Sequence, residues 1–383
     1  MRRRDLLRLG GLGLAAGSSL LLLGCRQESA TPTPVAPAAV PTSSAGTVSD
    51  PTPVSTPTAS ERMPTVTPTA REAARSVTIY SGRSQSLIGP LLDRIGQELG
   101  LDVRVRYGDT AELATAILEE GDRSPADLFF GQDAGALGAL AKENRLVTLP
   151  AELLERVPAI YRSRDGVWVG VSGRVRTVVY NTERVQLNEI PASIVDFAGN
   201  ERWRGRLGWA PTNGSFQAFV TGLRRLRGED VARRWLEGVK ALDTRIFPNN
   251  ASIVQAVIQG EIEAGFVNHY YLMRERAQAG RSLPAENFFY TNGDPGGLVN
   301  VAGVGVLASS RAQDAALQIV DYLLSESAQR YFSEQTFEYP LLEGIPAHPD
   351  LPPLETLNPP DLDLSDLDDL RGTLALLQEV GLL

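Results

Sequence analysis

Short apolar runs alternate with longer amphipathic segments along most of the chain. Val77–Tyr80 is typical of a strand, and segment 84–100 repeats its apolar residues at helical spacing. Pro90 suits a first helical turn, so this helix is expected to begin near Gly89. The alternation predicts an α/β fold with parallel-rich sheets flanked by helices. Further strands are expected at 103–107, 127–130, 168–171, 177–180 and 205–208, and further helices at 111–120, 216–227 and 231–242.

Two long extended apolar segments, at 167–180 and 298–307, are expected to cross between two lobes. A chain that leaves one lobe, builds another and returns has a hinge of two segments beside its cleft. That cleft is then the expected ligand site. With boundaries near 172 and 295, the first lobe comprises residues 76–171 and 295–342, and the second lobe comprises residues 172–294.

The last part of the chain, residues 343–383, is a Pro- and Asp-rich tail. A short terminal helix is expected at Thr373–Leu383, packing on the second lobe. Acidic residues alternate with leucines between positions 361 and 369, and no EF-hand glycine or terminal glutamate is in register. We therefore expect a solvated loop there and not a calcium site.

The first 25 residues have the features of an export signal. Arg2–Arg4 precede an apolar, Gly-rich segment that is too short for a comfortable membrane span. Its ending, Leu22–Cys25, resembles a bacterial lipobox, in which the cysteine is lipidated, and this pattern fits a buried core cysteine poorly. The opening also resembles a twin-arginine signal, so the export route stays open. Residues 26–75, rich in Pro, Thr, Ser and Ala, are expected to form a disordered tether.

Composition narrows the classes of function. The chain has 383 residues, 43% of them hydrophobic and 22% charged, which suffices for two domains. Its formal net charge of -9 argues against nucleic acid as the main partner. The single cysteine excludes a disulfide within the chain and a thiolate metal cluster. With two histidines, and no final glycine to make Gly170–Arg174 a nucleophile elbow, a Ser-His-Asp enzyme is not expected.

Two adjacent tyrosines, Tyr270 and Tyr271, follow an apolar run at 263–267 that predicts a strand. Ligands collect at the carboxyl ends of strands in open α/β sheets. Phenols there can converge on one target if the backbone turns, and a hard trivalent metal would make them good anionic ligands despite an ordinary pKa of about 10. Alternatively, both tyrosines begin a helix and pack half-buried, the more frequent outcome for an arbitrary pair. The preceding His269 is expected to face away and hold the turn.

A small polar turn, Pro211–Phe216, directly precedes a helical pattern. Free backbone N–H groups at such a turn can bind anions, which makes Asn213, Gly214 and Ser215 candidates for anion contacts. The turn is equally well explained as a cap, with Asn213 or Ser215 as the N-cap residue. Asn250, before the next helical pattern, has the same two interpretations.

Five short motifs follow one another in a specific order. They are Tyr80–Arg83, Tyr107–Asp109, Ser124–Asp127, Pro211–Gly214 and Asn268–Tyr271. With them, residues 76–345 resemble the ferric-ion-binding solute receptors of bacterial ABC iron transporters. The resemblance implies a two-lobed type II periplasmic-binding-protein fold that closes on iron and delivers it to a permease with its ATPase. In that family adjacent tyrosines supply two phenolates to Fe(III), and this role carries over onto Tyr270 and Tyr271.

The chain departs from the family pattern at several positions. Ser84 stands where many relatives have a histidine ligand, Gln132 where some have a glutamate, and Phe216 nearest to the additional tyrosines of others. Because two phenolates leave Fe(III) short of ligands, we expect a synergistic anion such as carbonate, phosphate or citrate. Tyr80, Tyr180 or Asp133 could fill the positions instead. The anion site or second shell is expected to include Asn213, Gly214, Ser215, Asn250, Arg83, Ser84, Gln132 and Asn268, and Arg174 and Arg176 could add positive charge or form hinge salt bridges.

The resemblance thus implies a monomeric, non-enzymatic, extracytoplasmic lipoprotein that captures Fe(III). Two alternatives stay open. The first is a receptor for another solute, such as an oxyanion or a polyamine, on the same fold; aromatic metal ligands favour iron over these. The second is an enzyme on a two-lobed scaffold, which would need paired acid and base groups in the cleft.

Overall fold

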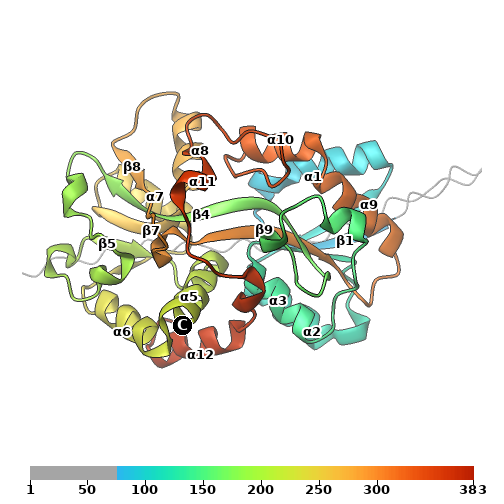
Figure 1. The fold of residues 1–383 in the computed structure, drawn as a ribbon, viewed down its shortest axis with the longest axis horizontal. Helices are drawn as coiled ribbons and strands as arrows, with labels where there is room; N and C mark the ends of the chain where they lie inside the picture. Colours follow the sequence, from blue (N-terminus) through green and yellow to red (C-terminus); the bar gives the residue numbers. More distant parts are fainter. Residues whose placement is uncertain (1–75) are drawn as a thin grey trace, which may run out of the picture. The chain divides into compact units, whose positions relative to one another are not determined.

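The computed structural model describes residues 76–383, which belong to one compact unit (Figure 1). The export signal at 1–25, the lipidation site Cys25 and the tether at 26–75 lie outside the described residues. Within the described part of the chain, no helix is both long enough and apolar enough to cross a membrane.

A mixed sheet of nine strands runs through both lobes in the order β2-β1-β3-β9-β4-β7-β5-β6, with β8 alongside β4. Strand β1 is parallel to β2 and β3, and β5 is parallel to β6 and β7. In contrast, β4 and β9 are antiparallel to every strand they pair with, so the expected parallel-rich sheets are parallel only in their outer parts. The bounds are β1 Ser76–Ser81, β2 Asp102–Tyr107, β3 Leu128–Gly131, β4 Val169–Asn181, β5 Leu207–Trp209, β6 Arg245–Ile246, β7 Ala264–Asn268, β8 Ala285–Phe288 and β9 Val299–Val306.

Strand β4 crosses between the lobes without a break. Its first half pairs with β9, and from Arg176 onward it pairs with β7 and then β8. The sequence predicted one extended crossing segment at 167–180 with strand patterns at 168–171 and 177–180, and the structure joins the two patterns in a single strand. All of β4 is buried, and its polar side chains are therefore enclosed by protein on both faces. The periodicity of a strand buried on both faces does not reveal its continuity.

Helices cover both faces of each half of the sheet. In the first lobe α1, α9 and α10 lie on one side and α2 and α3 on the other, and in the second lobe α7 and α8 lie opposite α5 and α6 (Figure 1). The bounds are α1 Gln85–Leu99, α2 Thr110–Glu120, α3 Ala134–Lys142, α4 Ala151–Leu154, α5 Gly214–Arg227, α6 Glu229–Lys240, α7 Asn250–Ile258, α8 Tyr270–Ala279, α9 Gln313–Leu323, α10 Glu326–Glu334, α11 Leu354–Leu357 and α12 Leu370–Glu379.

Helix α1 begins at Gln85 and not near Gly89, so the start predicted from Pro90 is wrong. Pro90 lies in the second turn with its ring exposed, where it removes one backbone hydrogen bond. The helix tolerates this loss because one face is buried over its whole length, and Gly100 ends it in the left-handed conformation. The buried apolar side chains are Leu87, Ile88, Leu91, Leu92 and Ile95.

The tail returns across both lobes. Leu362, Leu364 and Leu367 are buried in the core that includes the first-lobe strands, whereas α12 packs on α5 and also contacts α3. The alternating carboxylates face outward and pair with cations of both lobes. The solvated loop predicted for this stretch is therefore wrong, since its leucines are core residues. The ion pairs are Arg164 with Asp363 and Asp366, Lys142 and Arg225 with Asp368, and Arg224 with Asp369.

Candidate metal-binding cleft

Loops from both lobes line a cleft of about 350 Å³. The first lobe contributes the segments that follow β1, β2 and β3, and the second lobe contributes the starts of α5, α7 and α8. These segments lie at the carboxyl ends of their strands, the edge where α/β sheets bind ligands. The lining residues are Gly82, Arg83, Ser84, Ser86, Leu87, Tyr107, Gly108, Asp109, Gln132, Asn213, Asn249, Ala251, Tyr270, Tyr271 and Arg274.

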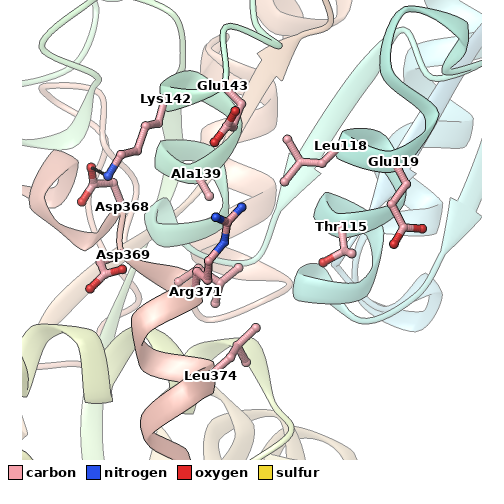
Figure 2. A pocket seen from close by; sticks show the side chains of 11 residues that line it. Thr115, Leu118, Glu119, Ala139, Lys142, Glu143, Asp368, Asp369, Arg371 and Leu374 are labelled. Atoms are coloured by element: carbon pink, nitrogen blue, oxygen red, sulfur yellow. Dashed lines mark ion pairs between the residues drawn. The ribbon is translucent and has the colours of Figure 1, made fainter.

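A larger cavity of about 590 Å³ lies between α2, α3 and α12 and shares no lining residue with this cleft (Figure 2). Lys142 and Asp368 form an ion pair at its edge, 3.6 Å apart. Across residues 76–383, no group of three or more His, Cys, Asp or Glu side chains could hold a metal ion. A metal site in this part of the chain would therefore need donors beyond such a group, and the tyrosines are candidates.

Tyr270 and Tyr271 form the first turn of α8, directly after β7. Their rings stack with centroids 4.2 Å apart and planes at 27°, so both phenols project to the same side although the residues are adjacent. Tyr270 is fully buried and Tyr271 half-buried, and both line the cleft. Burial raises the pKa of Tyr270 well above its ordinary value, so this phenol is protonated when no metal is bound. The helix start and the convergent phenols, treated as alternatives in the sequence analysis, occur together.

His269 holds the turn from behind. Its Nδ1 accepts a hydrogen bond from the Val175 N–H at 3.1 Å, so the proton lies on Nε2, which donates to the Phe337 carbonyl at 2.8 Å. Both ring nitrogens are therefore used, and the side chain is fully buried away from the cleft. Burial lowers the pKa of His269 to about 4, which keeps the ring neutral. This is the arrangement expected for His269 from the sequence.

Three buried arginines lie behind the cleft. Arg83 donates to both carboxylate oxygens of Glu338, at 2.8 and 2.7 Å. None of the three guanidinium nitrogens of Arg174 has a hydrogen-bond partner among the described residues. Arg176 donates to the Phe266 carbonyl and lies over the rings of Phe216 and Phe219.

Burial lowers the pKa of Arg174, with Arg83 adding repulsion, and it lowers the pKa of Arg176 to about 9. Burial alone would also lower the pKa of Arg83, but the adjacent Glu338 raises it. Arg174 makes only a 3.9 Å ion pair with Glu338, whose carboxylate Arg83 already binds closely, and buried cations without close counter-charges are costly unless negative charge arrives nearby. The buried positive charge near the tyrosines therefore favours anionic groups at this position.

Asp133 is the second buried carboxylate near the cleft. It caps α3 by accepting from the Ala136 N–H at 3.0 Å, and burial raises its pKa to about 6. A Cβ atom on Gly214 would lie 2.9 Å from Oδ2 of Asp133. The starts of α3 and α5 thus approach so closely that a larger residue at the first position of α5 would have to displace the Asp133 side chain.

The predicted anion-binding turn forms, but several of its polar groups hydrogen-bond to one another. Oδ1 of Asn213 accepts from the Ser215 N–H at 3.1 Å, the Ser215 hydroxyl at 2.6 Å and the Asn250 amide at 3.0 Å. Of the predicted residues Asn213, Gly214, Ser215 and Asn250, only Asn213 lines the cleft. The side-chain hydrogen bonds of this turn are therefore those of a helix cap, with Asn213 as the N-cap residue.

The remaining predicted site residues divide into two groups. Arg83, Ser84 and Gln132 line the cleft, and the buried Nε2 of Gln132 has no partner among the described residues. Asn268 does not line the cleft, and its backbone lies opposite that of Arg176 where β7 pairs with β4. Phe216, compared above with a family tyrosine position, is a core residue.

The family model for bacterial extracellular solute-binding proteins matches residues 123–366. The chain belongs to this family. The major ferric iron-binding protein of Neisseria meningitidis serogroup B is 31% identical over 313 residues, which cover 81% of this chain and 94% of the relative.

Two solved structures of 28% identity or more share the fold. Iron-bound HitA from Pseudomonas aeruginosa is 34% identical with a TM-score of 0.77, over 80% of this chain and 99% of that chain. FutA from Trichodesmium, in complex with iron and citrate ligands, is 28% identical with a TM-score of 0.67, over 80% of this chain and 100% of that chain. The family and the two-lobed α/β fold expected from the sequence are thereby confirmed, and the ligand roles of individual residues stay predictions.

Sequence reasoning missed several residues of the cleft in this solute-binding protein. Tyr107 and Asp109 were predicted only as part of a motif and not as site residues. Arg274 lies one helical turn after the tyrosines, a spacing that puts it on their face of α8. That spacing could have identified Arg274 from the sequence. Glu338 could not be identified in this way, because its contact with Arg83 joins positions 255 apart in the sequence.

Proposed function

We propose that this protein is an extracytoplasmic receptor that captures Fe(III) through Tyr270 and Tyr271 and delivers it to an ABC permease. The observation that carries the proposal is the stacked tyrosine pair, with both rings lining the cleft between the lobes. Relatives at about one-third identity that bind ferric iron support the metal's identity. Phenolate is a hard anionic oxygen donor, which suits Fe(III).

Charge supports an anion bound together with the iron. The buried groups near the tyrosines are Arg83, Arg174 and Arg176 against Glu338 and Asp133, an excess of positive charge. Fe(III) with two phenolates adds one further positive charge. We infer that a small anion such as carbonate, phosphate or citrate completes the coordination, and the neighbouring donors available to it are Arg274, Gln132 and Asn213.

The location and partners follow from the chain's first 75 residues and from its family. The Leu22–Cys25 lipobox pattern supports a lipid anchor at Cys25, and the tether would hold a monomeric receptor near the permease and its ATPase. Mass spectrometry of protein from its native cell is expected to find a lipidated Cys25 at the mature N-terminus. An intact, unmodified Cys25 would contradict the anchor.

An oxyanion receptor is the second candidate. The guanidinium of Arg174 favours it, because its ion pair with Glu338 is 3.9 Å long and without a hydrogen bond, and an oxyanion alone could supply closer negative charge. A polyamine fits poorly beside three buried arginines.

Iron binding measured by visible absorption separates these candidates. We expect the parent protein to develop a phenolate-to-iron absorption band with ferric citrate. Tyr270→Phe and Tyr271→Phe should each weaken iron binding by far more than the roughly 1 kcal/mol of a lost neutral hydrogen bond, because each removes a charged ligand. Tyr290→Phe, at a buried tyrosine away from the cleft, is the matched control and should keep the band. If the parent binds carbonate or phosphate but gives no band with iron, the oxyanion function replaces this proposal.

A further inference from the structure

The segment Thr336–Tyr339 follows α10 and contacts three structures around the cleft: the tyrosine turn, β4 and the loop after β1. We name this segment the connector. The carbonyl of Phe337 accepts the hydrogen bond from Nε2 of His269, behind the tyrosine turn. The backbone of Tyr339 pairs with Gly173 of the crossing strand β4 through two hydrogen bonds of 2.7 and 2.9 Å. Phe337 has a φ of 58°, in the left-handed region that non-glycine residues rarely adopt. Such a conformation persists only where surrounding contacts fix it.

Glu338 carries the connector's charge and is fully buried. Its carboxylate accepts both bonds from Arg83 and one each from the hydroxyls of Ser172, at 3.2 Å, and Thr336, at 2.9 Å. Arg174 lies 3.9 Å away. A carboxylate in this position fixes the Arg83 guanidinium, because moving it would break two buried charge-assisted hydrogen bonds and separate Arg83 from its counter-charge.

Arg83 connects this carboxylate to the tyrosines. Its guanidinium lies 5.7 Å from the ring centroid of Tyr270, the ring that also stacks on Tyr271, and the residue itself lines the cleft. Tyr270 is therefore contacted by a cation from the first lobe and by its neighbour from the second. Its position depends on Arg83, and the position of Arg83 depends on Glu338.

We propose that Glu338 is a positioning residue for the tyrosine pair, acting through Arg83, and that the connector links the first-lobe loop after β1 to the tyrosine turn. This inference rests on the proposed iron-binding function. Glu338 lies outside the lining of the cleft, so its effect on iron passes through the residues that it holds. Residues that orient metal ligands in this way typically affect metal affinity by about 10- to 100-fold.

The test compares Glu338→Gln with Glu263→Gln in the full chain. Glu263 also binds two arginines, Arg202 at 2.6 Å and Arg206 at 2.7 Å, but lies outside the cleft. Each variant is titrated with ferric citrate while the visible absorption band and the thermal unfolding temperature are recorded. We expect Glu338→Gln to bind iron about 10- to 100-fold more weakly with a shifted absorption maximum. Glu263→Gln should lose stability but keep the parent affinity and band position.

A double variant, Arg83→Met with Glu338→Met, separates positioning from stability. Replacing a buried ion pair by apolar residues of similar size often preserves folding, so this variant keeps the test usable if Glu338→Gln does not fold. We expect its iron binding to stay weak even when its unfolding temperature returns to that of the parent. Iron affinity that recovers along with stability would overturn the positioning role.

The two proposals fail in different ways. If the parent protein itself shows no phenolate-to-iron band, the proposed function is wrong and the positioning role falls with it. If the parent shows the band, and Glu338→Gln matches it in affinity and absorption maximum, only the positioning role is wrong.

Discussion

At His269 and Asp133, burial acts on two titrating side chains in opposite directions. The pKa of His269 falls from its ordinary 6.5 to about 4, whereas that of Asp133 rises from 3.8 to about 6. The folded state therefore holds the His269 proton less readily than the unfolded state and the Asp133 proton more readily. Stability due to neutral His269 is complete above pH 6.5 and is lost as pH falls toward 4. The cost of ionised Asp133 is absent below about pH 4 and complete above about pH 6.

Each of these shifts corresponds to about 3 kcal/mol, so the two effects nearly cancel between pH 4 and 6 in the parent. We expect the free energy of unfolding of His269→Gln to rise as pH is lowered across this window. Asp133→Asn, which keeps an oxygen to cap α3, should lose stability over the same window. Urea unfolding at several pH values measures both slopes. Parallel pH profiles for the parent and both variants would contradict the prediction.

A site residue could be predicted when the residues next to it in the sequence indicated its place in the fold. Tyr270 and Tyr271 follow a recognisable strand, and the polar turn at Asn213 precedes a recognisable helix, so adjacent sequence was sufficient for both. The pairing of Arg83 with Glu338 joins positions 255 apart, and nothing in the sequence next to either residue identifies its partner. The sequence also could not show that Arg174 pairs with Glu338 beside the crossing strand, at 3.9 Å and without a hydrogen bond.

At the scale of elements, the tail illustrates how alternation of Leu and Asp was misread. Leu362 and Leu364 are two residues apart, as in a half-buried extended segment, whereas Leu364–Leu367 is a 3-10 helix that buries Leu364 and Leu367 at a spacing of three. The acidic residues directed the interpretation toward a solvated loop. The acidic residues instead form partly exposed ion pairs with Arg164, Lys142, Arg224 and Arg225, while the leucines between them are buried.

We therefore predict that apolar packing, and not charge, holds the tail. Leu367→Ala should lower the free energy of unfolding by about 2–5 kcal/mol, because Leu367 is fully buried. Asp368→Asn should cost less than about 1 kcal/mol, because its pairs with Lys142 and Arg225 are partly exposed, and the loss should vanish in high salt. Urea unfolding of both variants with and without added salt provides the measurement. The opposite ranking would mean that the ion pairs hold the tail.

At the scale of the molecule, the crossing segments were visible in the sequence because long apolar runs are uncommon between polar turns. The runs expected at 167–180 and 298–307 lie on β4 and β9. Their antiparallel pairing was not predicted, since strand direction depends on which strands become neighbours in space. Two strands that join the lobes side by side form a hinge of limited freedom, so ligand can shift its equilibrium only through a different affinity for the open and closed forms.

Closure is expected to require both iron and an anion. Bringing the lobes together encloses Arg83, Arg174 and Arg176 with a metal that still carries positive charge after two phenolates bind, and a drier cleft strengthens this repulsion. An anion bound beside the metal in the cleft offsets this repulsion and favours the closed form. Small-angle scattering should therefore show a smaller radius of gyration with Fe(III) and carbonate, phosphate or citrate than with Fe(III) in anion-depleted, non-coordinating buffer. Tyr271→Phe, with the same additions, should stay at the larger radius. Equal radii in all conditions would mean that closure does not depend on ligand, and full closure with iron alone would mean that the protein completes the coordination by itself.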